Sequence, residues 1–177
     1  MHAGAYYFIQ WAIKRLPSRK RVCELGSRTV IWDNNAFEYN GLVRPLFRDA
    51  ERYIGVDVRE GINVDVVGNA ATWRPRPKES FDTVVCCETL EHTNEGKEIC
   101  KTAFDILECG GVFLVTAAGG DRAAHSCVDG GPNLYEGEYY HNVHYDMLSD
   151  WLSIFEFFMI DTVTNRDDIY AIAVKRK

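Results

Sequence analysis

The run Phe81–Cys87 (FDTVVCC) limits the fold of this chain more than any other segment. It is almost continuously apolar, which is typical of a central strand covered on both faces in a parallel sheet. A helical pattern over Gly96–Glu108 follows it, and a second apolar run covers Val112–Ala117. A strand, a helix and a second strand in this order predict a parallel βαβ unit, and therefore an α/β fold.

The rest of the chain repeats this alternation. Strands are predicted at Arg21–Leu25, Tyr53–Val58, Val64–Val67, Phe155–Val163 and Ile169–Val174, and helices at Tyr6–Leu16, Leu42–Glu51 and Met147–Ile154. Loops are predicted at Thr29–Phe37 and Gly119–Asn142, a turn at Asn40–Gly41, and the end of the helix from Gly96 at Gly110–Gly111. We expect the last two strands to form an antiparallel edge pair. The pattern predicts a doubly wound, mainly parallel sheet of seven strands, with an antiparallel strand near its end.

Length and charge narrow the class of protein. The 177 residues fit a single domain spanning 1–177. The net charge of −6 gives no electrostatic footprint for bulk nucleic-acid binding, so such a partner is disfavoured rather than excluded. No apolar run approaches the ~20 residues of a membrane span, and the start lacks the order of a signal peptide. None of the 6 cysteines forms a Cys-x-x-Cys pair, which suggests a reducing compartment. These features predict a cytoplasmic protein without membrane contacts.

The segment Arg21–Arg28 (RVCELGSR) is the first candidate for a ligand site. Glu24 places a carboxylate at the end of a predicted strand, and Gly26 follows it. Glycine allows a sharp turn and a close approach of a ligand, because it has no Cβ. Ligands of open α/β sheets bind outside the carboxyl ends of the strands. An ordinary strand-to-loop turn is an equally good interpretation of this segment alone.

Three further strand ends carry similar residues. They are Asp57, the pair Asn69–Ala70, and Glu88 after Cys87. The strand order of a doubly wound sheet would bring all of them to one crevice. A carboxylate after the second strand suits two vicinal ribose hydroxyls, because it accepts both hydrogen bonds.

Together these motifs resemble those of the class I S-adenosylmethionine-dependent methyltransferases, over nearly the whole chain. Glu24-Leu25-Gly26 is similar to the family's acid-x-Gly-x-Gly motif, and Asp57 to its ribose-binding acid. Gly68-Asn69-Ala70 is similar to the segment that reaches the adenine. The segment 80–92 resembles the fourth strand and the turn after it, and 107–111 resembles the family's Leu-Lys/Arg-Pro-Gly-Gly. The segment 40–57 is similar to a branch of small bacterial and phage-type domains.

The resemblance implies a Rossmann-like fold and S-adenosylmethionine as cosubstrate. It implies that Glu24, Gly26, Asp57, Asn69, Ala70 and Glu88 bind this cosubstrate. Two departures stand out: Arg28 replaces the second glycine of the first motif, and the spacing from Glu24 to Asp57 exceeds the roughly 20 residues usual for such motifs. The additional residues, 29–39, imply a remodelled loop over the methionine end of the cosubstrate.

The implied reaction is methyl transfer to a small-molecule or modest-sized acceptor. Such an enzyme mainly aligns a nucleophile with the methyl group and excludes water. Two alternatives remain: a non-catalytic cofactor-binding scaffold, and a nicotinamide-dependent oxidoreductase. The oxidoreductase is disfavoured because Gly-x-Gly-x-x-Gly is absent after the first strand.

The loop Gly119–Asn142 is expected to form the acceptor pocket. It is rich in glycine, and His125 and His141 are its candidate catalytic groups. A solvated loop histidine is the competing interpretation of His125. His141 and His144 have the spacing of a metal pair, but no third ligand is convincingly spaced, so no metal site is expected. Glu91-His92 is expected to open the following helix or to pack at its start.

Overall fold

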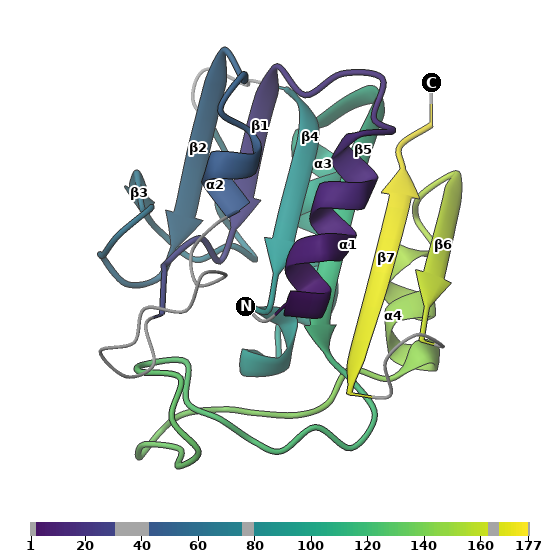
Figure 1. Ribbon diagram of the computed structural model, residues 1–177. Coiled ribbons are helices and arrows are strands. Elements are labelled where there is room, and N and C mark those ends of the chain that lie inside the picture. Colours follow the sequence, from purple (N-terminus) through teal and green to yellow (C-terminus); the bar gives the residue numbers. More distant parts are fainter. Residues whose placement is uncertain (1–2, 31–42, 76–79, 163–166, 177) are drawn as a thin grey trace.

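The computed structural model describes residues 3–30, 43–75, 80–162 and 167–176. Within them, a seven-stranded sheet has the order β3-β2-β1-β4-β5-β7-β6 (Figure 1). The strands are β1 Arg21–Leu25, β2 Arg52–Asp57, β3 Val66–Val67, β4 Phe81–Cys87, β5 Leu107–Ala118, β6 Phe157–Asp161 and β7 Asp168–Val174. β7 runs antiparallel to both β5 and β6, and the pairs among β1 to β5 are parallel. The predicted fold, with its antiparallel strand near the end, is confirmed.

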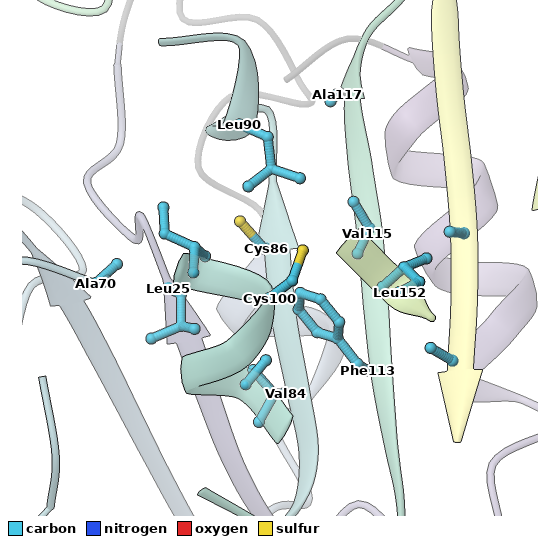
Figure 2. Close-up of a cluster of buried hydrophobic side chains, with 14 of the residues drawn as sticks. Leu25, Ala70, Val84, Cys86, Leu90, Cys100, Phe113, Val115, Ala117 and Leu152 are labelled. Atoms are coloured by element: carbon cyan, nitrogen blue, oxygen red, sulfur yellow. The ribbon is translucent and has the colours of Figure 1, made fainter. Parts of the chain in front are cut away.

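The central strand is β4, as its apolar sequence predicted. Every residue of β4 is buried, and it pairs with β1 on one side and β5 on the other. Val84 and Cys86 pack against one helical layer, which includes Cys100, as Figure 2 shows. Val85 and Cys87 belong to the core on the opposite face. The strand is apolar at successive positions because both of its faces are covered.

Helices cover both faces of the sheet (Figure 1). α1 Ala3–Ile13 and the short α2 Val43–Leu46 lie on one face, and α3 Gly96–Ile106 and α4 Tyr145–Leu152 on the other. A 3₁₀ turn, η1 Leu90–His92, lies between β4 and α3. Among the described residues, no helix has the length and apolar character that a bilayer crossing requires.

Several predicted boundaries were wrong. α3 ends at Ile106 because Leu107 already pairs with Phe81 as the first residue of β5, so Gly110–Gly111 lies inside a strand and does not end the helix. α1 begins at Ala3, and α4 runs from Tyr145, two residues before its predicted start. The third strand comprises only Val66–Val67, and α2 stops at Leu46. The predicted turn 40–41, most of the loop 29–37 and the start of the helix at 42 lie outside the described residues.

One edge of the sheet collects the segments that carry the predicted site. The carboxyl ends of β1, β2, β4 and β5 point to the same edge, and the long connection between β5 and α4 runs along it (Figure 1). The first residues of α1 lie at this edge too. Parallel pairing therefore fixes where a ligand site can form.

Candidate functional site

A cavity of about 730 Å³ opens at the carboxyl edge of the sheet. This volume lies within the ~300–1,000 Å³ typical of small-molecule and cofactor sites. The six residues predicted to bind the cosubstrate all line it, and so does His125; the six are Glu24, Gly26, Asp57, Asn69, Ala70 and Glu88. His141 is not among the lining residues. The strand ends thus meet around one space, as the strand order requires.

The turn after β1 places the backbone of Gly26, which has no side chain, at the cavity. Gly26 has φ +80°, a conformation that favours glycine, and its N–H donates to the carbonyl of Val56 over 2.8 Å. A Cβ at this position would lie 2.1 Å from Oγ1 of Thr89, which follows β4. Gly26 is therefore required for two reasons, its backbone conformation and the close approach of the Thr89 side chain.

Glu24 is buried beside this turn, with an exposed fraction of 4%. The hydroxyl of Tyr53 donates to its Oε2 over 2.6 Å. Burial raises the pKa of Glu24 to about 8, although the Tyr53 hydrogen bond and the positive charge of Arg44 act in the opposite direction. A cationic ligand next to Glu24 would favour the ionised carboxylate and would gain from its charge.

Asp57 ends β2 with its carboxylate held by backbone groups. The N–H of Arg28 donates to Oδ2 and the N–H of Arg59 to Oδ1, each over 3.0 Å. An ionised carboxylate has about four acceptor positions, so the two oxygens can accept further hydrogen bonds from a diol. The two backbone donors therefore orient the carboxylate without saturating it.

Asn69 and Ala70 form the side of the cavity next to β3. The N–H of Ala71 donates to Oδ1 of Asn69 over 2.8 Å, and Nδ2 of Asn69 donates to Glu95 over 2.9 Å. These bonds hold the segment after β3 against the start of α3. Such a fixed, partly apolar wall suits the planar ring predicted to bind there.

Arg122 is a site residue that the sequence did not reveal. Its Nη1 donates to Oε2 of Glu88 and to Oδ1 of Asp168, in both cases over 2.8 Å. Burial opposes the charged form of Arg122, but the two carboxylates outweigh it and raise its pKa. Glu88 itself adopts φ +51°, which is uncommon for a residue with a side chain. The three residues come from distant parts of the chain, and no local pattern connects them.

Arg28, which differs from the glycine of the motif that the segment resembles, makes contacts that the sequence did not predict. Its Nη2 donates to the carbonyl oxygens of Cys127 and Val128, the latter over 3.1 Å. Arg28 thus connects the turn after β1 with the long loop 119–142, and it lines the cavity between them. The side chain at the place of the second glycine in the motif that this segment resembles thus connects two walls of the cavity.

The loop 119–142 forms the opposite wall. The rings of His125 and His92 lie 4.9 Å apart, both line the cavity, and Tyr140 packs 5.0 Å from His125. Burial lowers the pKa of both histidines, that of His92 to about 3. His92 ends the separate turn η1, so Glu91-His92 precedes α3 and does not open it.

His141 lies elsewhere. Its N–H donates to the carbonyl of Glu91 over 2.9 Å, and its ring lies 5.2 Å from that of Tyr139. His144 is exposed immediately before α4. The catalytic role predicted for His141 stays a prediction.

Comparisons with known proteins relate part of the chain to a family and the whole chain to a fold. Residues 40–115 match the family model of a methyltransferase domain. No curated protein sequence matches the chain.

Solved structures share its fold at low sequence identity. The 1,6-didemethyltoxoflavin-N1-methyltransferase of Burkholderia thailandensis, solved with its acceptor and S-adenosylhomocysteine, is 13% identical, with a TM-score of 0.65 over 98% of this chain and 79% of that one. The CcbJ methyltransferase of Streptomyces caelestis is 18% identical, with a TM-score of 0.62 over 95% and 93%. The magnesium protoporphyrin IX methyltransferase of Synechocystis PCC 6803, solved with bound S-adenosylmethionine, is 16% identical, with a TM-score of 0.58 over 97% and 78%.

The family model covers residues 40–115, which include Asp57, Asn69 and Glu88. The shared fold extends the likeness to the remaining strands and helices. Residues 40–115 thus resemble a methyltransferase domain, and the fold of the whole chain is shared with solved methyltransferases.

Proposed function

We propose that the protein transfers the methyl group of S-adenosylmethionine to a small-molecule acceptor that binds in the same cavity. The observation that carries this proposal is the cavity of about 730 Å³, which has strand-end residues on one side and the loop 119–142 on the other. One structural neighbour acts, by its name, on the small molecule 1,6-didemethyltoxoflavin. The net charge of −6 argues against a nucleic-acid acceptor, and a cytoplasmic location remains our expectation.

The strand ends supply the cosubstrate side. Asp57 would accept hydrogen bonds from the ribose hydroxyls, and Asn69 and Ala70 would flank the adenine. Gly26 and Glu88 would hold the amino-acid end through their backbone. The Glu24 carboxyl would face the positive charge of the cosubstrate, which offsets the unfavourable burial of an ionised carboxylate.

The loop supplies the acceptor side. His125 lines the cavity and is one of the proton-accepting side chains contributed by the loop. The sulfonium already carries a good leaving group, so the protein's main tasks are alignment of the acceptor and exclusion of water. The tether from Arg28 to the loop keeps these two sides at a fixed separation.

Ligand binding tests the proposal first. A ligand that binds only the folded state raises its stability, by about 2.7 kcal/mol at a concentration of 100 Kd. We expect S-adenosylmethionine and S-adenosylhomocysteine to raise the melting temperature, and NAD to leave it unchanged. A shift with NAD alone would support the oxidoreductase instead. Incubation with methyl-labelled cosubstrate and a panel of small acceptors then detects transfer; binding without transfer to any acceptor would favour the scaffold.

Replacement of His125 by alanine tests whether the loop binds the acceptor or the cosubstrate. We expect turnover to fall while the affinity for S-adenosylmethionine stays within about twofold, because His125 would meet the acceptor and not the cosubstrate. His144→Ala is the matched control, since this exposed histidine lies outside the cavity. Lost cosubstrate binding with normal turnover at saturation would place the loop over the cosubstrate.

A further inference from the structure

Three side chains next to the cavity have the composition of a metal site. Glu91, His92 and His125 each offer a ligand atom, and these atoms lie within 4.8 Å of one another. Metal ligands at 2.0–2.2 Å from a tetrahedral ion are separated from each other by roughly 3.4 Å. A movement of about 1 Å by the side chains would therefore close the cluster around one ion.

Burial leaves this cluster in need of a ligand. Glu91 has an exposed fraction of 0%, and within the described part of the chain its two carboxylate oxygens have no partner at ordinary hydrogen-bond geometry, although the N–H groups of Glu91 and Ala118 lie near enough to favour its ionised form. Nδ1 of His92 is likewise buried and has no hydrogen-bond partner among these residues. A buried carboxylate without partners is unfavourable by several kcal/mol, so such groups are usually paired or bind a metal.

The surrounding charges favour a cation. Glu88 and Asp168 share the single guanidinium of Arg122. The charge of Glu88 acts on Glu91 and that of Glu138 on His92, while Arg122 acts on both in the opposite direction. A cation bound by the cluster would favour the ionised carboxylate of Glu91, which burial opposes.

The geometry points to a divalent first-row transition-metal ion, such as Zn²⁺ or Co²⁺, bound by Glu91, His92 and His125. Two imidazoles and one carboxylate form the ligand set of catalytic zinc sites that keep an open position. Imidazole nitrogen suits these ions, whereas Mg²⁺ and Ca²⁺ take oxygen ligands. His141 and His144, whose spacing suggests a metal pair, do not belong to this cluster.

The position of the ion would define the acceptor, an inference that rests on the proposed methyl transfer. His92 and His125 line the cavity, whereas Glu91 does not, so the open coordination positions would face the cavity. A hydroxyl bound there would lose its proton to water more readily, because a metal lowers the pKa of a coordinated oxygen. Its oxygen lone pair then forms the bond to the methyl carbon, and the electron pair of the broken carbon–sulfur bond stays on sulfur as S-adenosylhomocysteine leaves. The acceptor class is therefore a small hydroxyl compound.

Titration of chelator-treated protein with Zn²⁺ and Co²⁺, followed by calorimetry, tests the site without the cosubstrate. We expect one ion per chain, with at least about tenfold weaker binding in Glu91→Gln and His125→Ala. His144→Ala should bind as the parent protein does. No binding, or binding unchanged in Glu91→Gln, for example through the thiols of Cys109 and Cys127, would overturn the assignment.

A crystal soaked in Zn²⁺ provides a check that does not depend on the folding of a variant. Anomalous scattering should place the ion between Glu91, His92 and His125; an ion elsewhere refutes the site. Labelled methyl transfer with and without chelator then separates the two proposals. Transfer that persists without metal supports the methyltransferase and defeats the metal's role, whereas metal binding without binding of S-adenosylmethionine defeats the proposed function alone.

Discussion

At the residue scale, the charge state of Glu24 depends strongly on the fold. Its side chain is almost completely buried, and this burial raises its pKa to about 8 although Tyr53 donates a hydrogen bond to it. The sequence predicted the position of this acid from the glycine that follows it. It could not predict the charge state, because Tyr53 and Arg44 reach Glu24 only after β1 and β2 have paired.

Glu24 makes the stability of the ligand-free protein depend on pH. Its folded-state pKa of about 8 exceeds the ~4.3 of an unfolded glutamate, so the folded state binds more protons between these values. Proton binding by Glu24 contributes fully to the free energy of unfolding below the unfolded pKa. This contribution is lost as the pH rises through the folded pKa, by at most about 1.4 kcal/mol per pH unit. We expect the free energy of unfolding of Glu24→Gln, measured with urea, to increase relative to that of the parent protein between about pH 5 and about pH 8. An equal difference at both pH values would mean that Glu24 is ionised throughout.

A second prediction at this scale concerns the role of Asp57 in cosubstrate binding. Asp57→Ala should weaken binding of S-adenosylmethionine by about 1–3 kcal/mol, the range of hydrogen bonds to charged groups. The same change removes the acceptors for the N–H groups of Arg28 and Arg59, so Asp57→Asn, which keeps an acceptor oxygen, serves as the conservative comparison. Asp49→Ala, at an exposed position away from the cavity, is the control in the same calorimetric series. Unchanged affinity in Asp57→Ala would refute the ribose assignment.

At the scale of elements, the sequence predicted the strands better than the loops that connect them. Phe81–Cys87 was recognisable because a strand buried on both faces is apolar at successive positions. The strand-end residues followed from the topology of parallel sheets. The ion pairs of Arg122 and the cluster of Glu91, His92 and His125 were not predictable, because they depend on the path of the loop 119–142. Hydrophobic periodicity carries no information on such a path.

Arg28 provides the test at this scale, since it joins two elements. Arg28→Gly restores the glycine of the family motif and removes the donors to the carbonyls of Cys127 and Val128. We expect faster hydrogen exchange over residues 126–128, with a loss of unfolding free energy of about 1 kcal/mol, the usual value for such hydrogen bonds. Arg59→Ala is the matched control, because the Arg59 guanidinium contacts Sγ of Cys127, at 3.9 Å, and neither of the two carbonyls that Arg28 binds. Equal exchange in both variants would show that the loop is held by its internal hydrogen bonds.

At the scale of the whole molecule, the sheet separates two cores that unfold together if the domain is cooperative. Cys23, Cys86 and Cys100 belong to one core and Cys87 to the other, whereas Cys109 is exposed and Cys127 partly so. A thiol reagent should therefore modify Cys109 and Cys127 in the native state and the four buried thiols only on global unfolding. Mass spectrometry measures the labelling of each thiol at increasing urea concentrations, and circular dichroism measures the global unfolding with which it is compared. Earlier labelling of Cys87 alone would show either that the reagent reaches it through the cavity, which Cys87 lines, or that the α1 face opens separately.

The contact between Gly26 and Thr89 also limits how this protein can evolve. A side chain at position 26 meets two separate obstacles, the left-handed backbone and the Thr89 hydroxyl. A smaller residue at 89 would remove the collision and leave the backbone strain in place. No single compensating substitution at position 89 can therefore restore a Gly26→Ala variant fully, and selection for regained function should return the original codon far more often than a second-site suppressor.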